Sequence, residues 1–168
     1  MTDTGAAPAR RVAIVIGSRS DMAAADKAAA VLAELEVASE IRVISAHRAP
    51  ELLARYVASA EERGVAAFVA IAGLAAHLPG VIASQTTLPV IGVPMPGGVS
   101  DGLDALLAIV QMPKGVPVAT VGVGNGENAG LLAAAILATA DEPLRARLQG
   151  RRRAQAEAIA ADPANEGL

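Results

Sequence analysis

Five short runs of aliphatic, mostly β-branched residues recur along this chain, and segments with helical spacing separate them. The runs cover residues 12–16, 41–44, 67–72, 90–93 and 116–121. Strands that are apolar on both faces and alternate with helices are typical of a parallel sheet covered on both sides. The pattern therefore predicts an α/β protein with a parallel sheet at its centre.

The segments between the runs repeat apolar residues at steps of three and four. In the first of them Met22, Ala25, Ala29 and Leu32 form one face, opposite charged residues such as Lys27. Helices are expected at 22–35, 50–64, 78–84, 103–112, 128–140 and 143–160. The expected fold is a three-layer α/β/α sandwich of flavodoxin-like type, with a five-stranded parallel core and an added C-terminal helix. Residues 11–161 are expected to form a single domain, and residues 1–10 and 162–168 flexible tails.

Composition excludes several classes of function. The chain has no cysteine, a net charge of −3 and two aromatic residues, Tyr56 and Phe68. Without a basic surface or aromatic stacking platforms, nucleic acid is not an expected partner. Residues 64–100 contain no Asp, Glu, Lys or Arg, but glycine and proline interrupt them repeatedly, so no membrane-spanning helix is predicted. The apolar run at 12–16 is too short for a signal peptide, and we expect a cytoplasmic protein.

Alanine accounts for 40 of the 168 residues. An alanine buries much less apolar area than a leucine, so a single subunit gains modest stabilisation per ordered residue. We therefore expect the subunits to associate in a tight homo-oligomer.

Candidate site residues directly follow the predicted strands. They lie at the carboxyl ends of the strands, where ligands bind in such folds. Gly17, Ser18 and Asp21 come after the first run and lead into a helix, a position that attracts phosphate groups. The same residues also fit a helix-capping box, in which the Ser18 and Asp21 side chains serve only the backbone. Both interpretations stay open at this point.

The two histidines also follow strands. His47 and Arg48 come after the second run and combine a proton carrier with an anion clamp, although an exposed polar loop has the same composition. His77 comes after the third run, where it either contacts a ligand or caps a helix. Two histidines without a neighbouring carboxylate pair are too few for a metal site. The residues alone thus indicate a pocket for a small phosphorylated molecule, with His47 as acid and base.

Five sequence motifs occur in an order that closely resembles the PurE family, the 5-(carboxyamino)imidazole ribonucleotide mutases of purine biosynthesis. They are GSRSD at 17–21, SAHRAP at 45–50, AAHLPG at 75–80, IVQMPKGVPVAT at 109–120 and NAGLLA at 128–133. The resemblance extends over residues 11–155. It implies an isomerase that moves a carboxyl group from the exocyclic nitrogen of the nucleotide to a ring carbon.

The resemblance also implies roles for single residues. His47 matches the general acid and base of the family, and Ser18, Asp21 and Arg48 match residues that bind the ribose phosphate. The residues that match the wall of the base and carboxylate pocket are Gly17, Ser45, Ala46, Gly73, His77 and Leu78. The family uses no cofactor and no metal, and it forms homo-octamers.

Two departures from the family pattern are visible. Leu74 stands where many bacterial members have glycine, and the loop at 122–127 is about two residues shorter than theirs. The alternative function is an aminoimidazole ribonucleotide carboxylase that uses free carbon dioxide, although that branch tends to have lysine where this chain has Arg48. A more remote alternative is a non-enzymatic flavodoxin-like nucleotide-binding module. A receiver module needs an aspartate at the end of its third strand, where this chain has Ala72 and Gly73.

Overall fold

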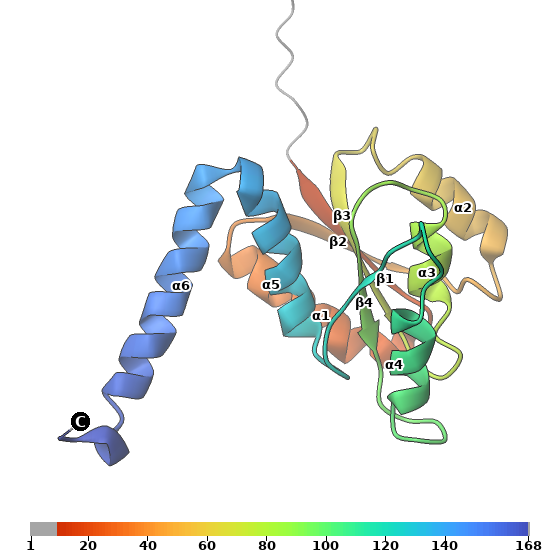
Figure 1. The fold of residues 1–168 in the computed structure, drawn as a ribbon. Coiled ribbons are helices and arrows are strands. Elements are labelled where there is room, and N and C mark those ends of the chain that lie inside the picture. Colours follow the sequence, from red (N-terminus) through yellow and green to blue (C-terminus); the bar gives the residue numbers. More distant parts are fainter. Residues whose placement is uncertain (1–9, 168) are drawn as a thin grey trace, which may run out of the picture.

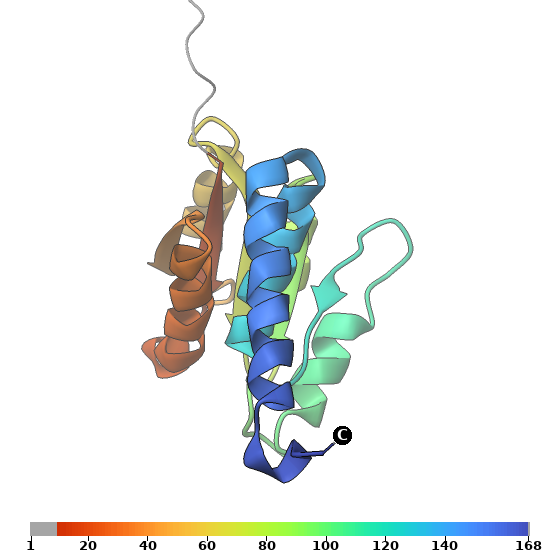
Figure 2. The same cartoon turned by 90° about the vertical axis from the view of Figure 1, so that its left-hand side faces the viewer.

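The computed structural model describes residues 10–167, and these form the predicted three-layer α/β/α sandwich. The helices and strands alternate along the chain, with the sheet in the middle layer (Figures 1 and 2). The strands are β1 (Arg11–Ile16), β2 (Ala38–Val43), β3 (Val65–Ala72), β4 (Val90–Pro94) and β5 (Ala119–Thr120). The α-helices are α1 (Met22–Glu34), α2 (Pro50–Ala58), α3 (Leu78–Ala83), α4 (Leu103–Val110), α5 (Gly126–Leu137) and α6 (Glu142–Ala160).

All five strands are parallel, and their order in the sheet is β2-β1-β3-β4-β5. The chain moves outward from β1 to β2 and then returns to place β3 on the other side of β1. Strand order thus reverses between β1 and β3, where Ile16 pairs with Ile71. Gly17 and Gly73 directly follow these two strands, so both loops open at the point where doubly wound sheets bind ligands.

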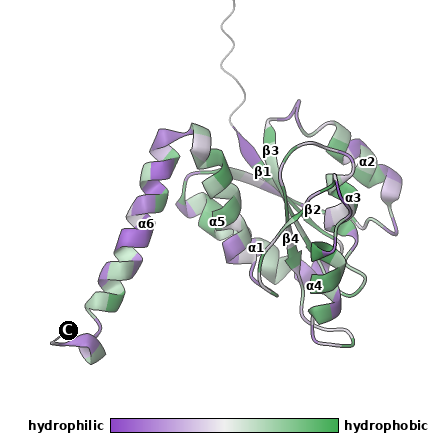
Figure 3. Cartoon of the chain, in the orientation of Figure 1, coloured by the Kyte–Doolittle hydropathy of each residue, from purple (hydrophilic) through white to green (hydrophobic). Residues whose placement is uncertain are grey.

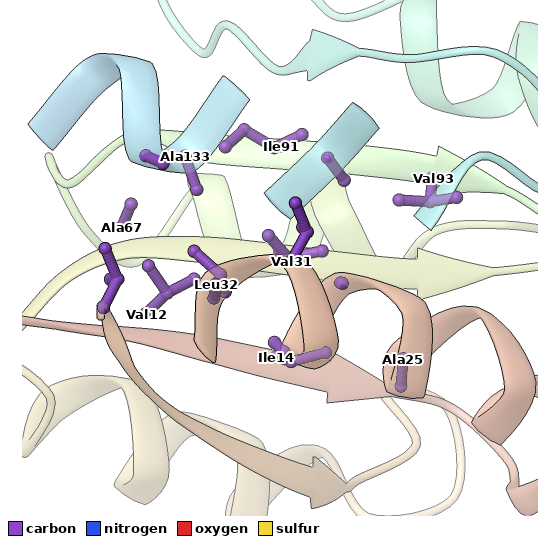
Figure 4. Close-up of a cluster of buried hydrophobic side chains, with 14 of the residues drawn as sticks. Val12, Ile14, Ala25, Val31, Leu32, Ala67, Ile91, Val93 and Ala133 are labelled. Atoms are coloured by element: carbon purple, nitrogen blue, oxygen red, sulfur yellow. The ribbon is translucent and has the colours of Figure 1, made fainter. Parts of the chain in front are cut away.

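Each face of the sheet has its own apolar core. One core packs β1, β3 and β4 against α1 and α5, and Figure 4 shows Val12, Ile14, Leu32 and Ile91 within it. The other core lies beneath α2, α3 and α4 and contains Phe68, which is fully buried. Figure 3 shows the central strands as predominantly apolar. Successive side chains of a strand point to opposite faces of the sheet, and both faces are buried here. The central strands are therefore continuous apolar runs in the sequence.

The two edge strands differ from the prediction. β2 begins at Ala38, earlier than predicted, and its residues are exposed or half-buried because it has a neighbour on one side only. β5 pairs through Ala119 and Thr120 alone, although the apolar run begins at position 116. Pro117 lacks the N–H group that a strand ladder requires, which shortens this strand.

Helix boundaries agree with the prediction to within a few residues, except for α2. The sequence predicts that this helix continues to Gly64, whereas the structure ends it at Ala58 and adds a turn. Gly64 does adopt a positive φ of 78° there, but it leads into β3 and does not terminate the helix itself. Of the two predicted tails, residues 1–9 lie outside the described residues. Residues 163–165 form a 3₁₀ turn, and the flexibility of 162–168 stays a prediction.

α6 projects away from the sandwich, as Figure 1 shows. Leu144 is its one buried residue, and the rest of the helix is half-buried or exposed. Arg151 ties α6 to the body of the molecule through Glu34 at 3.2 Å and Glu127 at 2.6 Å. None of the helices in residues 10–167 combines the length and the hydropathy that a membrane crossing needs.

A polar network fixes the edge strand β2 to α2. Glu40 accepts a hydrogen bond of 2.7 Å from the Tyr56 hydroxyl, and its carboxylate lies 3.3 Å from Arg63 and 2.9 Å from Arg42. The Arg63 guanidinium also stacks 4.5 Å above the Tyr56 ring. Burial by itself raises the pKa of Glu40, but the hydroxyl and the two arginines outweigh it and lower that pKa below the ordinary 4.5. Burial and Glu40 together raise the pKa of Tyr56.

Replacing Glu40 by glutamine is expected to reduce the free energy of unfolding by about 1 kcal/mol at neutral pH. Because folding lowers the pKa of Glu40, its contribution is complete above pH 4.5 and is lost as the pH falls through the lower folded value. Urea unfolding near pH 7 and near pH 3 should therefore show a difference between wild type and Glu40→Gln that shrinks in acid. Glu51→Gln, on the exposed side of α2, is the matched control. An equal difference at both pH values contradicts the ionic role of Glu40.

Candidate active site

A cavity of about 680 Å³ lies at the carboxyl ends of the strands, where the loops after β1, β2, β3 and β4 meet. Nine of the ten site residues predicted from the sequence line it: Gly17, Ser18, Asp21, Ser45, Ala46, His47, Arg48, Gly73 and Leu78. These residues come from positions up to 61 apart in the sequence and are brought together by the switch in strand order.

The loop after β1 supplies two acceptors and a helix start. Ser18 adopts an extended conformation and its hydroxyl accepts a hydrogen bond of 3.4 Å from the Ser20 backbone N–H, which caps the 3₁₀ turn at Arg19–Asp21. Asp21 accepts from the Ser20 hydroxyl at 3.0 Å and makes no cap bond to α1. The reciprocal capping box that the sequence allows is therefore not formed.

Asp21 is partly withdrawn from water. Burial raises the pKa of its carboxyl group, and the hydrogen bond from Ser20 opposes this shift. None of the described residues places a cation within salt-bridge distance of Asp21. A desolvated carboxylate with free lone pairs is suited to accept hydrogen bonds from ligand hydroxyl groups.

Arg48 connects the loops after β1 and β2. Its guanidinium donates a hydrogen bond of 2.8 Å to the Gly17 carbonyl, and its backbone N–H donates to the Ser45 hydroxyl at 3.3 Å. The single bond to Gly17 leaves other N–H groups of this exposed guanidinium available. Arg48 therefore places a fixed positive charge beside Ser18, where an anion would also meet the start of the helical segment.

The two histidines are in direct contact. Nε2 of His47 lies 2.9 Å from Nδ1 of His77, and the rings are nearly perpendicular at 86°. A hydrogen bond between two imidazole nitrogens requires one proton between them, so one ring donates and the other accepts. His77 occupies the N-cap position of α3, as one of the two alternatives predicted, but its side chain makes no cap bond. It stands next to His47 and is not among the residues that line the cavity.

The remaining wall of the cavity is apolar and tightly fitted. Gly73 faces the side chain of Met95 so closely that an added Cβ would lie 3.3 Å from the Met95 Cβ. The Met95 backbone N–H donates to the Ala72 carbonyl at 2.9 Å, which extends the pairing of β3 and β4 into the site. The lining residues that the sequence did not single out as site residues are Ser20, Ala72, Leu74, Ala75, Met95 and Pro96.

Most of these additional residues carry little chemical signal in a sequence. Ala72, Ala75, Met95 and Pro96 are small or apolar, and their position after a strand is the one feature that marks them. Residues 10–167 contain no group of three or more His, Asp or Glu side chains arranged to hold a metal ion. The chemistry that the described cavity offers is thus proton transfer by an imidazole pair, next to an arginine and a carboxylate.

The family model described as AIR carboxylase matches residues 11–158, nearly the whole length of the sandwich and α6. The chain belongs to the AIR carboxylase family. The resemblance to PurE proteins inferred from the five motifs is thereby confirmed, as is the predicted fold class.

Relatives within this family carry two different names. An N5-carboxyaminoimidazole ribonucleotide mutase of Mycobacterium tuberculosis is 52% identical over 164 residues, which cover 98% of this chain and 93% of that protein. A chloroplastic phosphoribosylaminoimidazole carboxylase of Vigna aconitifolia is 50% identical over 145 residues, 86% of this chain but 26% of that protein. The crystal structure of Treponema denticola PurE matches with a TM-score of 0.85 and 28% identity, covering 95% of this chain and 99% of that one.

Proposed function

We propose that this chain is an N5-carboxyaminoimidazole ribonucleotide mutase, an isomerase of purine biosynthesis. The observation that carries the proposal is the contact of His47 with His77 at a cavity that also holds Arg48, Ser18 and Asp21. The cavity thus combines an acid and base with an anion clamp and a hydroxyl acceptor. The Mycobacterium tuberculosis relative, 93% of which the match covers, carries the name of this mutase.

The reaction needs one group that first gives and then takes a proton. His47 protonates the carbamate nitrogen, the C–N bond breaks, and carbon dioxide and an electron-rich aminoimidazole are left in the cavity. The ring carbon then attacks carbon dioxide, and His47 removes the proton from that carbon. Because the two proton transfers occur in sequence, the His47 imidazole serves both. The contact with His77 at 2.9 Å holds the His47 ring in place from the first transfer to the second.

The polar side of the cavity suits a ribose phosphate. Arg48 supplies a charge-assisted fork for phosphate oxygens, and Ser18 supplies a hydroxyl at the start of the helical segment. Asp21 accepts hydrogen bonds from sugar hydroxyl groups. The base and the migrating carboxylate face the part of the wall formed by Gly17, Ser45, Ala46, Gly73 and Leu78, and His77 acts on them only through His47. The reaction as written uses no cofactor and no metal.

An aminoimidazole ribonucleotide carboxylase that takes up free carbon dioxide is the second candidate. The observation in its favour is the carboxylase name of the Vigna aconitifolia relative, of which this chain spans about a quarter. Carboxylation and migration end in the same ring-carboxylated product, so one cavity can in principle support either reaction. The two differ in the substrate that must enter.

The deciding experiment offers the purified protein each substrate separately. Product formed from the carbamate nucleotide without added bicarbonate supports the mutase. Product formed only from the unsubstituted aminoimidazole nucleotide together with bicarbonate supports the carboxylase and overturns the proposal. The absorbance of the ring-carboxylated product provides the readout, and a sample without protein corrects for spontaneous decarboxylation.

The assembly and location of the chain complete the proposal. We propose a homo-octamer, because the family resemblance implies one and the alanine-rich cores give a single subunit little apolar burial per residue. We also place it in the cytoplasm, because a phosphorylated nucleotide does not cross membranes and must be used where it is made.

Arg48→Ala is expected to raise the KM for the nucleotide about 10- to 100-fold, because a charge-assisted hydrogen bond to phosphate is lost. The effect on kcat should be much smaller, since Arg48 donates no proton in the reaction. Steady-state kinetics check this, with Arg19→Ala as the control because Arg19 is an exposed neighbouring arginine that does not line the cavity. An unchanged KM for Arg48→Ala would remove its phosphate role.

A further inference from the structure

Leu74 occupies an unusual backbone position at the rim of the cavity. Its φ is +55°, in the left-handed region that favours glycine, and its side chain is 62% exposed. The backbone is held there by the loop itself, because the Leu74 carbonyl accepts a hydrogen bond of 2.8 Å from the Ala76 N–H. A large apolar side chain in a strained and exposed position makes no evident contribution to folding, and such positions gather at functional sites.

The Leu74 side chain reaches across to the loop after β4. An added Cβ on Gly98 would lie 3.0 Å from Leu74 Cδ2, so the absence of a side chain at Gly98 makes room for the leucine. That loop is itself well fixed, since Gly97 donates to the Asp101 carboxylate at 3.2 Å and Gly102 donates to the Gly97 carbonyl at 2.9 Å. Leu74 and Gly98 therefore bridge the two loops at the rim of the cavity.

Leu74 and His47 both line the same cavity. When a ligand covers an apolar side chain that is otherwise largely in water, the burial of that apolar area stabilises the complex. In the proposed reaction carbon dioxide, a small apolar molecule, is free between breakage of the C–N bond and formation of the C–C bond. An apolar side chain at the rim would lower the rate at which it leaves and water enters.

We propose that Leu74 is a specificity-determining residue that closes the rim of the cavity over the bound nucleotide and retains carbon dioxide during the transfer. This inference rests on the proposed mutase function. The proton given by His47 to the carbamate nitrogen is balanced by the proton it takes from the ring carbon, and the carboxyl carbon of the product is that of the substrate. Retention therefore determines whether the carboxyl group comes from the substrate or from dissolved carbon dioxide.

The test compares wild type with Leu74→Gly and Leu74→Asn. Glycine removes the side chain and relieves the backbone strain, whereas asparagine tolerates a positive φ, keeps a side chain of similar length and is polar. In Leu74→Gly, relief of the backbone strain stabilises the folded state, whereas the greater backbone freedom of glycine stabilises the unfolded state. The two effects oppose each other, so the Tm of this variant should change by less than about 4 °C. If Leu74→Gly does not fold, Leu74→Asn alone still tests the apolar character.

Each protein converts the carbamate nucleotide in buffer with ¹³C-bicarbonate, and mass spectrometry measures the label in the product. We expect little label with wild type, about fivefold more with both variants, and a KM raised about tenfold by the lost apolar contact. Equal label in all three proteins, or full label already in wild type, overturns the role of Leu74. The unlabelled carbamate assay with wild type reports separately on the proposed function, because it does not involve the variants.

Discussion

His47→Asn is expected to lower kcat by about three orders of magnitude, the size of effect associated with a lost general acid and base. Asparagine keeps a polar side chain but has no group that exchanges a proton near neutral pH. His47 is exposed and its ring contacts His77 rather than the core, so the substitution leaves the sandwich intact. Single-turnover kinetics with the carbamate nucleotide measure the loss in the chemical step directly.

The comparison also requires that the variant still binds. Calorimetric titration with the ring-carboxylated product should give a Kd within about tenfold of wild type, because Arg48 and Ser18 provide the main contacts to the phosphate. Circular dichroism and Tm serve as the folding control. If His47→Asn retains kcat within about tenfold of wild type while folding and binding normally, another group transfers the proton and the mechanism is wrong.

Gly126→Ala is expected to reduce the free energy of unfolding by about 3 kcal/mol, at the upper end of the range for overpacking. Gly126 begins α5 and is buried against α1, where an added Cβ would lie 2.0 Å from the Ala24 carbonyl oxygen. That neighbour is backbone and cannot rotate away, so one of the two helices must move. Urea unfolding monitored by circular dichroism gives the change.

Gly122→Ala is the matched control for this substitution. Its added Cβ would meet nothing closer than the Asn125 Cβ at 3.9 Å, an ordinary contact distance. The two variants thus make the same chemical change four residues apart in the same glycine-rich segment. If Gly126→Ala unfolds at the same urea concentration as Gly122→Ala, α1 and α5 do not pack as closely as described.

The role of the glycines at 122–130 is visible in the structure and not in the sequence. In the sequence, this segment is rich in glycine and follows a strand, but its glycine spacing does not fit the dinucleotide-binding fingerprint. In the structure, Gly126 and Gly130 instead allow α5 to approach α1, and neither lines the cavity. A glycine permits both a turn and a close helix contact, so the sequence alone did not distinguish them.

The arrangement of the two histidines is a further case. Their positions after β2 and β3 predict that they lie at the same end of the sheet, and their direct contact confirms this. The sequence did not predict that Nε2 of His47 lies 2.9 Å from Nδ1 of His77, or that His77 stands beside the cavity wall. Side-chain contacts across loops depend on strand order and on the rotation of each ring, which local patterns do not encode.

The sequence by itself determined the fold class, the central strands and the loops that carry the site. Runs of apolar residues reveal buried strands, and periodic spacing reveals helices, because both patterns arise from burial along a single element. Only the tertiary structure decided the extent of β2 and β5, the contact between Leu74 and the loop at Gly98, and the close packing of α1 on α5. These features depend on which elements become neighbours, and that is settled when the sheet assembles.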